Sequence, residues 1–150
     1  IYGSLLVMKA LIVASQIFSI MLIQKILQRV KLPSKHVLLY SLNPLVILES
    51  TGNLHFEAFV VVFLLASFYY LEKNNLTPSA LFFSLAVCTK LLPLLFLPAL
   101  LFYIGWKKSM RYYLVVGLAC LILFLPSLNQ EIITGLSTSL AYYFKKFEFN

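Results

Sequence analysis

Long apolar runs separated by short polar breaks make up almost the whole sequence. The first run covers residues 2–27, which is longer than the roughly 20 residues that a helix needs to cross a bilayer core. Later runs are shorter, and prolines or single charged residues interrupt them. Short helices that stop within a membrane are tolerated only where protein or a water-filled cavity covers the freed backbone groups. The pattern therefore predicts an all-α, polytopic transmembrane helical bundle with short broken helices around an outward-facing cavity.

Helix-start signals and prolines divide this bundle into six expected spans within a single partial transmembrane domain, residues 1–150. Ser34 can cap the second helix, Pro44 should kink it, and Thr77-Pro78 marks the start of the fourth. The expected spans are residues 2–27, 36–49, 54–72, 78–89, 93–104 and 112–126, followed by an external interfacial tail at 127–150. We also expect the chain to be part of a longer protein.

The apolar stretch that ends at Ile104 allows two topologies. One long tilted span would place the basic cluster of Lys107, Lys108 and Arg111 outside, whereas two half-length helices with a turn near Lys90 would keep it inside. Because basic residues concentrate in cytoplasmic loops, the second topology is favoured. The polar break at residues 51–57, the Lys90 turn and the tail would then face one external compartment.

Composition and charge support a membrane location. The chain is 61% hydrophobic and 11% charged, with a mean hydropathy of +0.93, against about 45–50% apolar and about 25% charged in soluble domains. The formal net charge is +7, but the basic residues cluster as they do in cytoplasmic loops, which makes nucleic acid a poor candidate partner. The two basic clusters are Lys25, Arg29, Lys31 and Lys35 in one connection, and Lys107, Lys108 and Arg111 in another. No Gly-rich phosphate loop, nucleophile elbow or HExxH motif occurs. We expect a multi-pass protein of the plasma membrane with an external active site.

The densest group of polar residues lies around one break between apolar runs and includes Asn53, His55 and Glu57. A polar turn between apolar segments is a functional-site candidate by default, and we assign catalysis to Glu57 and His55 and substrate binding to Asn53. Helix capping by Asn53 and a favourable first-turn charge on Glu57 would be a structural alternative that leaves His55 unexplained. Residues two apart do not face each other on a regular helix, so a direct contact between His55 and Glu57 is not expected. His55 and Glu57 alone would make a weak metal site, because divalent metal ions usually need more ligands, although a divalent metal stays possible.

Three lysines are assigned to substrate binding. Lys90 lies between apolar runs, where an ammonium beside a cavity suits a phosphate, although a lysine reaching from a helix end towards the surface is the alternative. Lys145 and Lys146 lie among aromatic residues in the tail, a composition that by itself is typical of an interfacial anchor. Lys9 shares a helical face with Gln16 and is expected to line the helix bundle.

Four motifs in order carry a resemblance to a known family. They are Asn43-Pro44, then Gly52 to Ala58 (GNLHFEA), then Thr89 to Pro93 (TKLLP), then Tyr143 to Asn150 (YFKKFEFN). This order resembles the integral-membrane GT-C glycosyltransferases, especially the polyprenol-phosphate-mannose-dependent mannosyltransferases of glycosyltransferase family 87. The sequence departs from the family at Glu57, where relatives often have Asp, and at Phe147, where Trp is common.

The resemblance implies a many-span hexosyltransferase. Such an enzyme moves a hexose, typically mannose, from a polyprenyl-phosphate donor to a lipid-linked or glycan acceptor on the extracytoplasmic side, without a nucleotide site. It also implies that the catalytic base is an acidic residue in an external loop upstream of Ile1. Two other classes stay open: a secondary transporter, which also has broken helices and intramembrane charge, and a non-catalytic membrane subunit.

Overall fold

The computed structural model describes residues 2–52, 55–127, 135 and 138, and within these residues every regular element is helical. The predicted all-α class is therefore confirmed. The α-helices are α1 (Tyr2–Arg29), α2 (Leu38–Ser41), α3 (Pro44–Val46), α4 (Glu57–Glu72), α5 (Leu76–Thr89), α6 (Leu97–Ile104) and α7 (Trp106–Phe124). Short 3-10 turns cover Ser34–Val37, Leu92–Phe96 and Leu125–Ser127, and a π-helical turn covers Ile47–Gly52.

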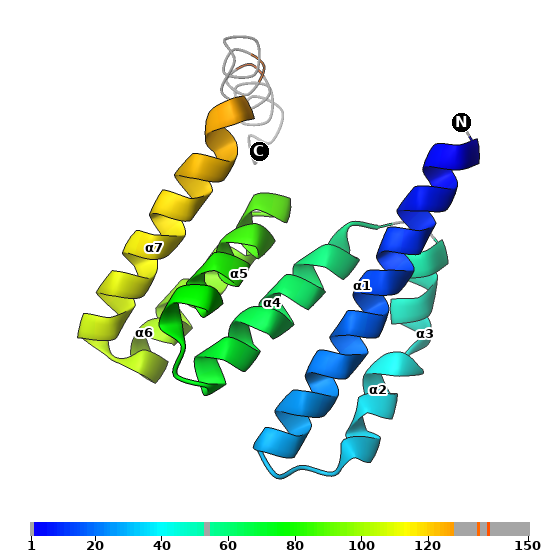
Figure 1. The fold of residues 1–150 in the computed structure, drawn as a ribbon, viewed down its shortest axis with the longest axis horizontal. Helices are drawn as coiled ribbons and strands as arrows, with labels where there is room; N and C mark the ends of the chain where they lie inside the picture. Colours follow the sequence, from blue (N-terminus) through cyan, green and yellow to red (C-terminus); the bar gives the residue numbers. More distant parts are fainter. Residues whose placement is uncertain (1, 53–54, 128–134, 136–137, 139–150) are drawn as a thin grey trace, which may run out of the picture.

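The helices alternate in direction, so that the described part of the bundle has two distinct ends (Figure 1). The end of α1, the turn between α4 and α5, and the turn between α6 and α7 lie together at one end. Arg29 joins two of these elements by donating to the backbone carbonyl of Glu72 from Nε (3.2 Å) and Nη2 (2.9 Å). The π-helical turn, the start of α4 and the end of α5 lie at the other end. The basic clusters and the candidate site therefore occupy opposite ends.

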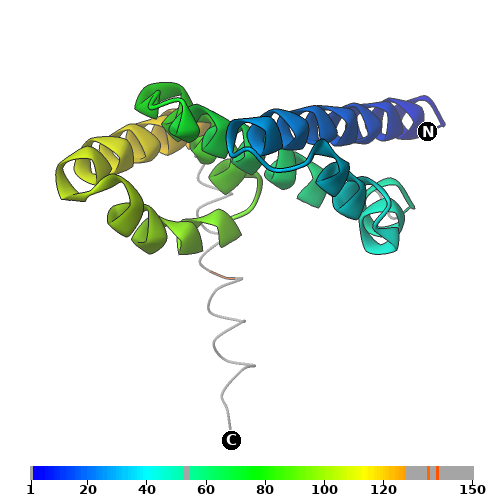
Figure 2. The same cartoon turned by 90° about the horizontal axis from the view of Figure 1, so that it is seen from below.

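The core lies between α4, α5 and α7. Its buried residues are Leu71, Ala80, Phe83, Val87, Tyr112 and Val116. Helix α1 packs on α4 and buries Ile12, Ser15 and Ser19, while α6 and the α2–α3 segment project to one side of the row of longer helices (Figure 2).

The second expected span is not one kinked helix but a series of short pieces. Asn43 caps α3 by accepting a hydrogen bond at Oδ1 from the amide of Leu45 (3.0 Å), and Pro44 is the first residue of that helix. The Asn-Pro pair therefore starts a new helix, because proline lacks the amide donor that continuation of α2 would need. The predicted cap at Ser34 is wrong: Pro33 precedes the first turn, which has no side-chain cap.

The chain reverses direction at Lys90, as in the hairpin topology. Helix α5 ends at Thr89, and Lys90 is extended (φ −157°, ψ 137°), because Pro93 three residues later could not donate the helical hydrogen bond to Thr89. The last long helix differs from its expected bounds: α7 begins at Trp106, so the second basic cluster occupies its first turns instead of a loop. Helix α5 likewise begins at Leu76, one residue before the predicted Thr77 cap.

Among the described residues, one helix, Gly3–Arg29, is long and apolar enough to cross a bilayer, and the segments Leu76–Thr89 and Leu92–Ile104 are apolar but shorter. Large apolar side chains are nevertheless exposed along the other helices, with Phe102 87% exposed and Leu39 77% exposed. The six-span bundle stays a prediction.

Candidate functional site

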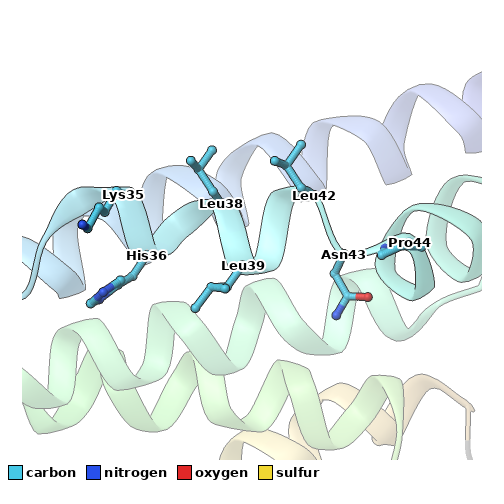
Figure 3. A pocket seen from close by; sticks show the side chains of 7 residues that line it. All are labelled: Lys35, His36, Leu38, Leu39, Leu42, Asn43 and Pro44. Carbon is cyan, nitrogen blue, oxygen red and sulfur yellow. The ribbon is translucent and has the colours of Figure 1, made fainter.

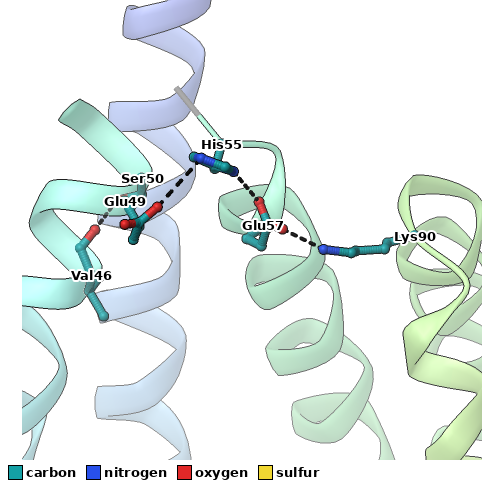
Figure 4. A network of polar contacts seen from close by, with 6 residues as sticks. All are labelled: Val46, Glu49, Ser50, His55, Glu57 and Lys90. Atoms are coloured by element: carbon teal, nitrogen blue, oxygen red, sulfur yellow. Dashed lines mark hydrogen bonds and ion pairs between the residues drawn. The ribbon is translucent and has the colours of Figure 1, made fainter. Parts of the chain in front are cut away.

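Four charged or titratable side chains form a continuous chain at the end of the bundle away from the basic clusters (Figure 4). Glu49 Oε2 lies 3.4 Å from His55 Nε2, His55 Nδ1 lies 3.2 Å from Glu57 Oε2, and Glu57 Oε1 lies 2.5 Å from Lys90 Nζ. These residues come from the π-helical turn, the connection before α4, the start of α4 and the end of α5. Each side chain is about half exposed, so a ligand can reach all four.

The local backbone explains why Glu49 reaches this site. The π-helical turn widens the helix just where the apolar segment ends, and single π turns of this kind occur often at functional sites. The amide of His55 then donates to the carbonyl of Glu49 (3.4 Å), which brings the two side chains together across the break. Glu49 was not among the predicted site residues.

The direct contact between His55 and Glu57 contradicts the sequence prediction. We expected the third span to begin at residue 54, and on a regular helix side chains two apart point in different directions. Helix α4 instead begins at Glu57, with Phe56 before it as the N-cap residue. His55 therefore lies outside the helix, where the helical spacing rule does not apply.

Lys90 is paired in the structure. Its extended backbone lets the ammonium reach Glu57 on the neighbouring helix, and the side chain is 51% exposed. The sequence predicted that Lys90 either binds a phosphate or reaches from a helix end towards the surface. In the structure its ammonium lies at an exposed helix end and also contacts the Glu57 carboxylate. Binding of a phosphate by Lys90 stays a prediction, and it would have to compete with or extend this ion pair.

The ion pair with Lys90 also affects the protonation of the Glu57 carboxylate. Glu57 lies at the exposed start of α4, before the apolar part of the helix. The hydrogen bond from Lys90 and then the carboxylate's contact with its own backbone amide lower the pKa of Glu57 below its ordinary value. A lower pKa keeps Glu57 ionised at neutral pH and makes it a weaker base. The lower pKa therefore favours Glu57 as a hydrogen-bond acceptor for a hydroxyl group over Glu57 as the base that removes the proton.

A pocket of about 370 Å³ adjoins this chain of residues, and apolar side chains line part of it. We call it the polar pocket because six of its lining residues are polar or charged. Its walls come from α1, α2, α3, the π-helical turn, the connection before α4 and α4 itself. Its polar members are Gln16, Tyr40, Glu49, Ser50, His55 and Glu57. Gln16 and Tyr40 were not among the predicted site residues. The signal for Gln16 was present, because an amide side chain in the middle of a long apolar helix needs a polar partner. Tyr40 had no comparable signal in the sequence.

An apolar cleft of about 510 Å³ lies beside the polar pocket. Residues of α4, α5, the 3-10 turn Leu92–Phe96 and α6 line this cleft, among them Leu64, Phe68, Phe96 and Tyr103. Val61 lines both the cleft and the polar pocket. A molecule with a polar head and an apolar tail would therefore find both environments side by side.

A third cavity, of about 600 Å³, lies on the outer face of α2 and contains none of the predicted site residues (Figure 3). Leu38, Leu39 and Leu42 form its apolar wall, and Lys35 and His36 lie at the end near the basic clusters. It differs from the polar pocket because no carboxylate lines it.

Some predicted residues cannot be placed. Asn53, Lys145 and Lys146 lie outside the described residues, so their assignment to substrate binding stays a prediction. Within residues 2–52 and 55–127, no group of three or more His, Cys, Asp or Glu side chains is arranged to hold a metal ion, and the divalent metal also stays a prediction.

Comparison with known proteins assigns this helical chain to a class of sugar-transferring proteins. Residues 1–106 match the family model described as "Alpha-(1->6)-mannopyranosyltransferase, N-terminal domain" (the MptA_B family). GPI mannosyltransferase 1 of Candida albicans (strain SC5314) is 31% identical over 106 residues, an alignment that covers 67% of this chain and 27% of the relative. No solved structure matches the chain.

The chain belongs to the MptA_B family of mannosyltransferases. The sequence prediction of a mannosyltransferase family is thereby confirmed, whereas membership of glycosyltransferase family 87 and the GT-C architecture stay predictions. The chain spans about a quarter of the length of the curated relative that it matches.

Proposed function

We propose that the intact protein is a multi-pass membrane mannosyltransferase that moves mannose from a polyprenyl-phosphate donor to a lipid-linked or glycan acceptor on the extracytoplasmic side. The observation that carries this proposal is the position of the polar pocket beside an apolar cleft, at the end of the bundle opposite the basic clusters. A lipid-phosphate sugar is itself part polar and part apolar. The cleft is suited to its isoprenoid chain, and the polar end is suited to its sugar and phosphate.

The distribution of charge supports the proposed orientation. Basic side chains gather at the turns after α1, between α4 and α5, and at the start of α7, and cytoplasmic segments of membrane proteins carry such an excess of lysine and arginine. The opposite end, which holds His55 and Glu57, would then face outside. The exposed leucine and phenylalanine side chains along the helices suit contact with lipid or with the rest of the protein.

Each residue of the site has a proposed role. The Lys90 ammonium is placed to stabilise the negative charge of the leaving phosphate, and Glu57 is placed to bind an acceptor hydroxyl or to assist its proton transfer. His55 bridges Glu57 and Glu49 and so holds the carboxylate in position. The low basicity of Glu57 agrees with the expectation, from the family resemblance, that another acidic residue accepts the proton.

Membranes that contain the intact protein, incubated with labelled polyprenyl-phosphate mannose, test the reaction. We expect label to pass into a lipid-linked or glycan acceptor, with release of polyprenyl phosphate. Uptake of label into sealed vesicles without a new glycosidic bond would instead identify a transporter, and the absence of both would leave a non-catalytic subunit. Either result would overturn the proposal.

Site accessibility tests the orientation independently. A single cysteine placed at Phe56 or at Lys108, with Cys88 and Cys120 replaced by alanine, would be exposed to a membrane-impermeant maleimide in intact cells. We expect Phe56→Cys to react from outside and Lys108→Cys to react only after the membrane is opened. Labelling of Phe56→Cys only in opened cells would place the site in the cytoplasm and contradict the proposed sidedness.

A further inference from the structure

The polar pocket contains an amide whose orientation the structure fixes. The hydroxyl of Tyr40 on α2 donates to Oε1 of Gln16 on α1 (2.8 Å). Among the described residues, Nε2 of Gln16 makes no hydrogen bond. Because an amide nitrogen carries two N–H donors, Gln16 presents donors to a ligand while Tyr40 holds its carbonyl oxygen.

The charge of the pocket walls limits what the ligand can be. Glu49 and Glu57 line the pocket, and no lysine or arginine does. A phosphate group in the pocket itself would face two carboxylates and would be repelled. A neutral ligand that carries many hydroxyl groups fits better, because its hydroxyls can donate to carboxylate oxygens and accept from the Gln16 amide.

The remaining walls suit the carbon skeleton of such a ligand. The Tyr40 side chain, Leu45 and Val61 supply apolar surface between the polar groups. Pockets that bind small molecules combine mostly apolar walls with a few placed polar groups, in volumes of about 300–1,000 Å³. A pyranose ring has the same combination, since C–H groups cover its faces and hydroxyls project from its edge.

We propose that this pocket binds a neutral hexopyranose ring, with Gln16 and Glu49 contacting ring hydroxyls and Tyr40 acting as a positioning residue for Gln16. This inference rests on the proposed function and adds to it the residues that recognise sugar. The ring belongs either to the mannosyl group of the donor or to the terminal sugar of the acceptor.

Kinetics of Gln16→Leu in the intact protein separate these two sources. We expect KM for one substrate to rise about tenfold, the loss that accompanies one hydrogen bond to a ligand, with a smaller change in kcat. A rise confined to the donor KM assigns the ring to the donor, and a rise confined to the acceptor KM assigns it to the acceptor. Gln24→Leu is the matched control, because Gln24 is an exposed glutamine on the same helix outside the pocket lining.

A second variant and a second measurement keep the test decisive. Tyr40→Phe removes only the hydroxyl that orients Gln16, and we expect it to raise the same KM about two- to threefold. Saturable binding of labelled methyl α-mannoside to the purified protein should weaken in Gln16→Leu but not in Gln24→Leu. This binding is independent of transfer, so it would persist if the proposed reaction failed. Unchanged KM values and unchanged binding in both Gln16→Leu and Tyr40→Phe would overturn the sugar-pocket proposal.

Discussion

Three buried hydroxyl groups join the helices at the centre of the bundle, whereas four half-exposed charged or titratable side chains line its polar end. In the centre, the hydroxyl of Tyr112 lies 3.1 Å from Ser67 Oγ and 3.2 Å from Ser79 Oγ, and Ser79 Oγ also donates to the carbonyl of Ser67 (2.8 Å). These three side chains are at most 4% exposed. The central hydroxyls are neutral and hydrogen-bonded to one another, so they hold α4, α5 and α7 together.

The polar end has the opposite properties. Its charged groups contact one another across four elements, yet each keeps about half of its side chain accessible. Ion pairs that are this exposed stabilise a protein little, so stability alone does not explain their presence at the end of an apolar bundle. The comparison predicts that substitutions at the polar end change transfer, whereas substitutions at the centre change stability.

Substitution of Glu57 by glutamine has the largest expected effect. The change keeps the size of the side chain but removes the charge that pairs with Lys90 and that would bind the acceptor hydroxyl. We expect the rate of mannose transfer in the intact protein to fall about 10- to 100-fold, as for the loss of a charged hydrogen bond. Glu72→Gln is the matched control, since Glu72 ends the same helix at the opposite end of the bundle. Equal rates in Glu57→Gln and wild type would remove Glu57 from the site.

Replacement of Lys90 by methionine should have the next largest effect. Methionine keeps the apolar stem but loses the ammonium that is proposed to stabilise the leaving phosphate. We expect about a tenfold loss of transfer, with partial recovery in Lys90→Arg, because a guanidinium also binds phosphate but with a different shape. Lys73→Met, at the basic end, serves as the control. A wild-type rate in Lys90→Met would show that Lys90 only pairs with Glu57.

Replacement of Tyr112 by phenylalanine tests the other side of the comparison. Loss of its hydroxyl leaves Ser67 and Ser79 with fewer partners in a buried site. We expect the free energy of unfolding to fall by about 1–3 kcal/mol, measured as a lower Tm in detergent, while transfer by the folded protein is unchanged. Tyr70→Phe is the control, since the Tyr70 hydroxyl makes no hydrogen bond within the described part of the chain. A loss of transfer without a loss of stability would contradict the structural role.

The helical class and the two ends of the bundle could be predicted from the sequence. The lengths of the apolar runs and the positions of lysine and arginine along the chain are sufficient for both predictions. The reversal at Lys90 could be predicted for the same reason. The segment around Asn43 could not, since the sequence does not show whether a proline kinks a helix or begins a new one. The structure resolves this through the cap that Asn43 provides.

The candidate site was predicted in part. His55, Glu57 and Lys90 were chosen because charge within apolar sequence needs an explanation, and the structure brings all three together. The contact between His55 and Glu57 was missed because it depends on where α4 begins, a boundary that differs from the expected one by three residues. Gln16 and Tyr40 were missed because their meeting depends on how α2 packs on α1, which no local pattern encodes.

Two glycines provide a matched pair of tests for the scaffold, and Gly117 has the smallest expected effect. Gly105, the single residue between α6 and α7, has φ 80° and ψ 158°, a conformation that is costly for residues with a side chain. We expect Gly105→Ala to lower the free energy of unfolding by about 1–3 kcal/mol. Gly117 is exposed within α7, with nothing within 4 Å of an added methyl group, so Gly117→Ala should raise stability by about 0.5–1 kcal/mol. Thermal unfolding of both variants should therefore shift in opposite directions, while the KM and kcat of transfer stay those of the wild type. A change in kinetics from either glycine would show that the scaffold and the polar end are coupled, and the division between them would no longer hold.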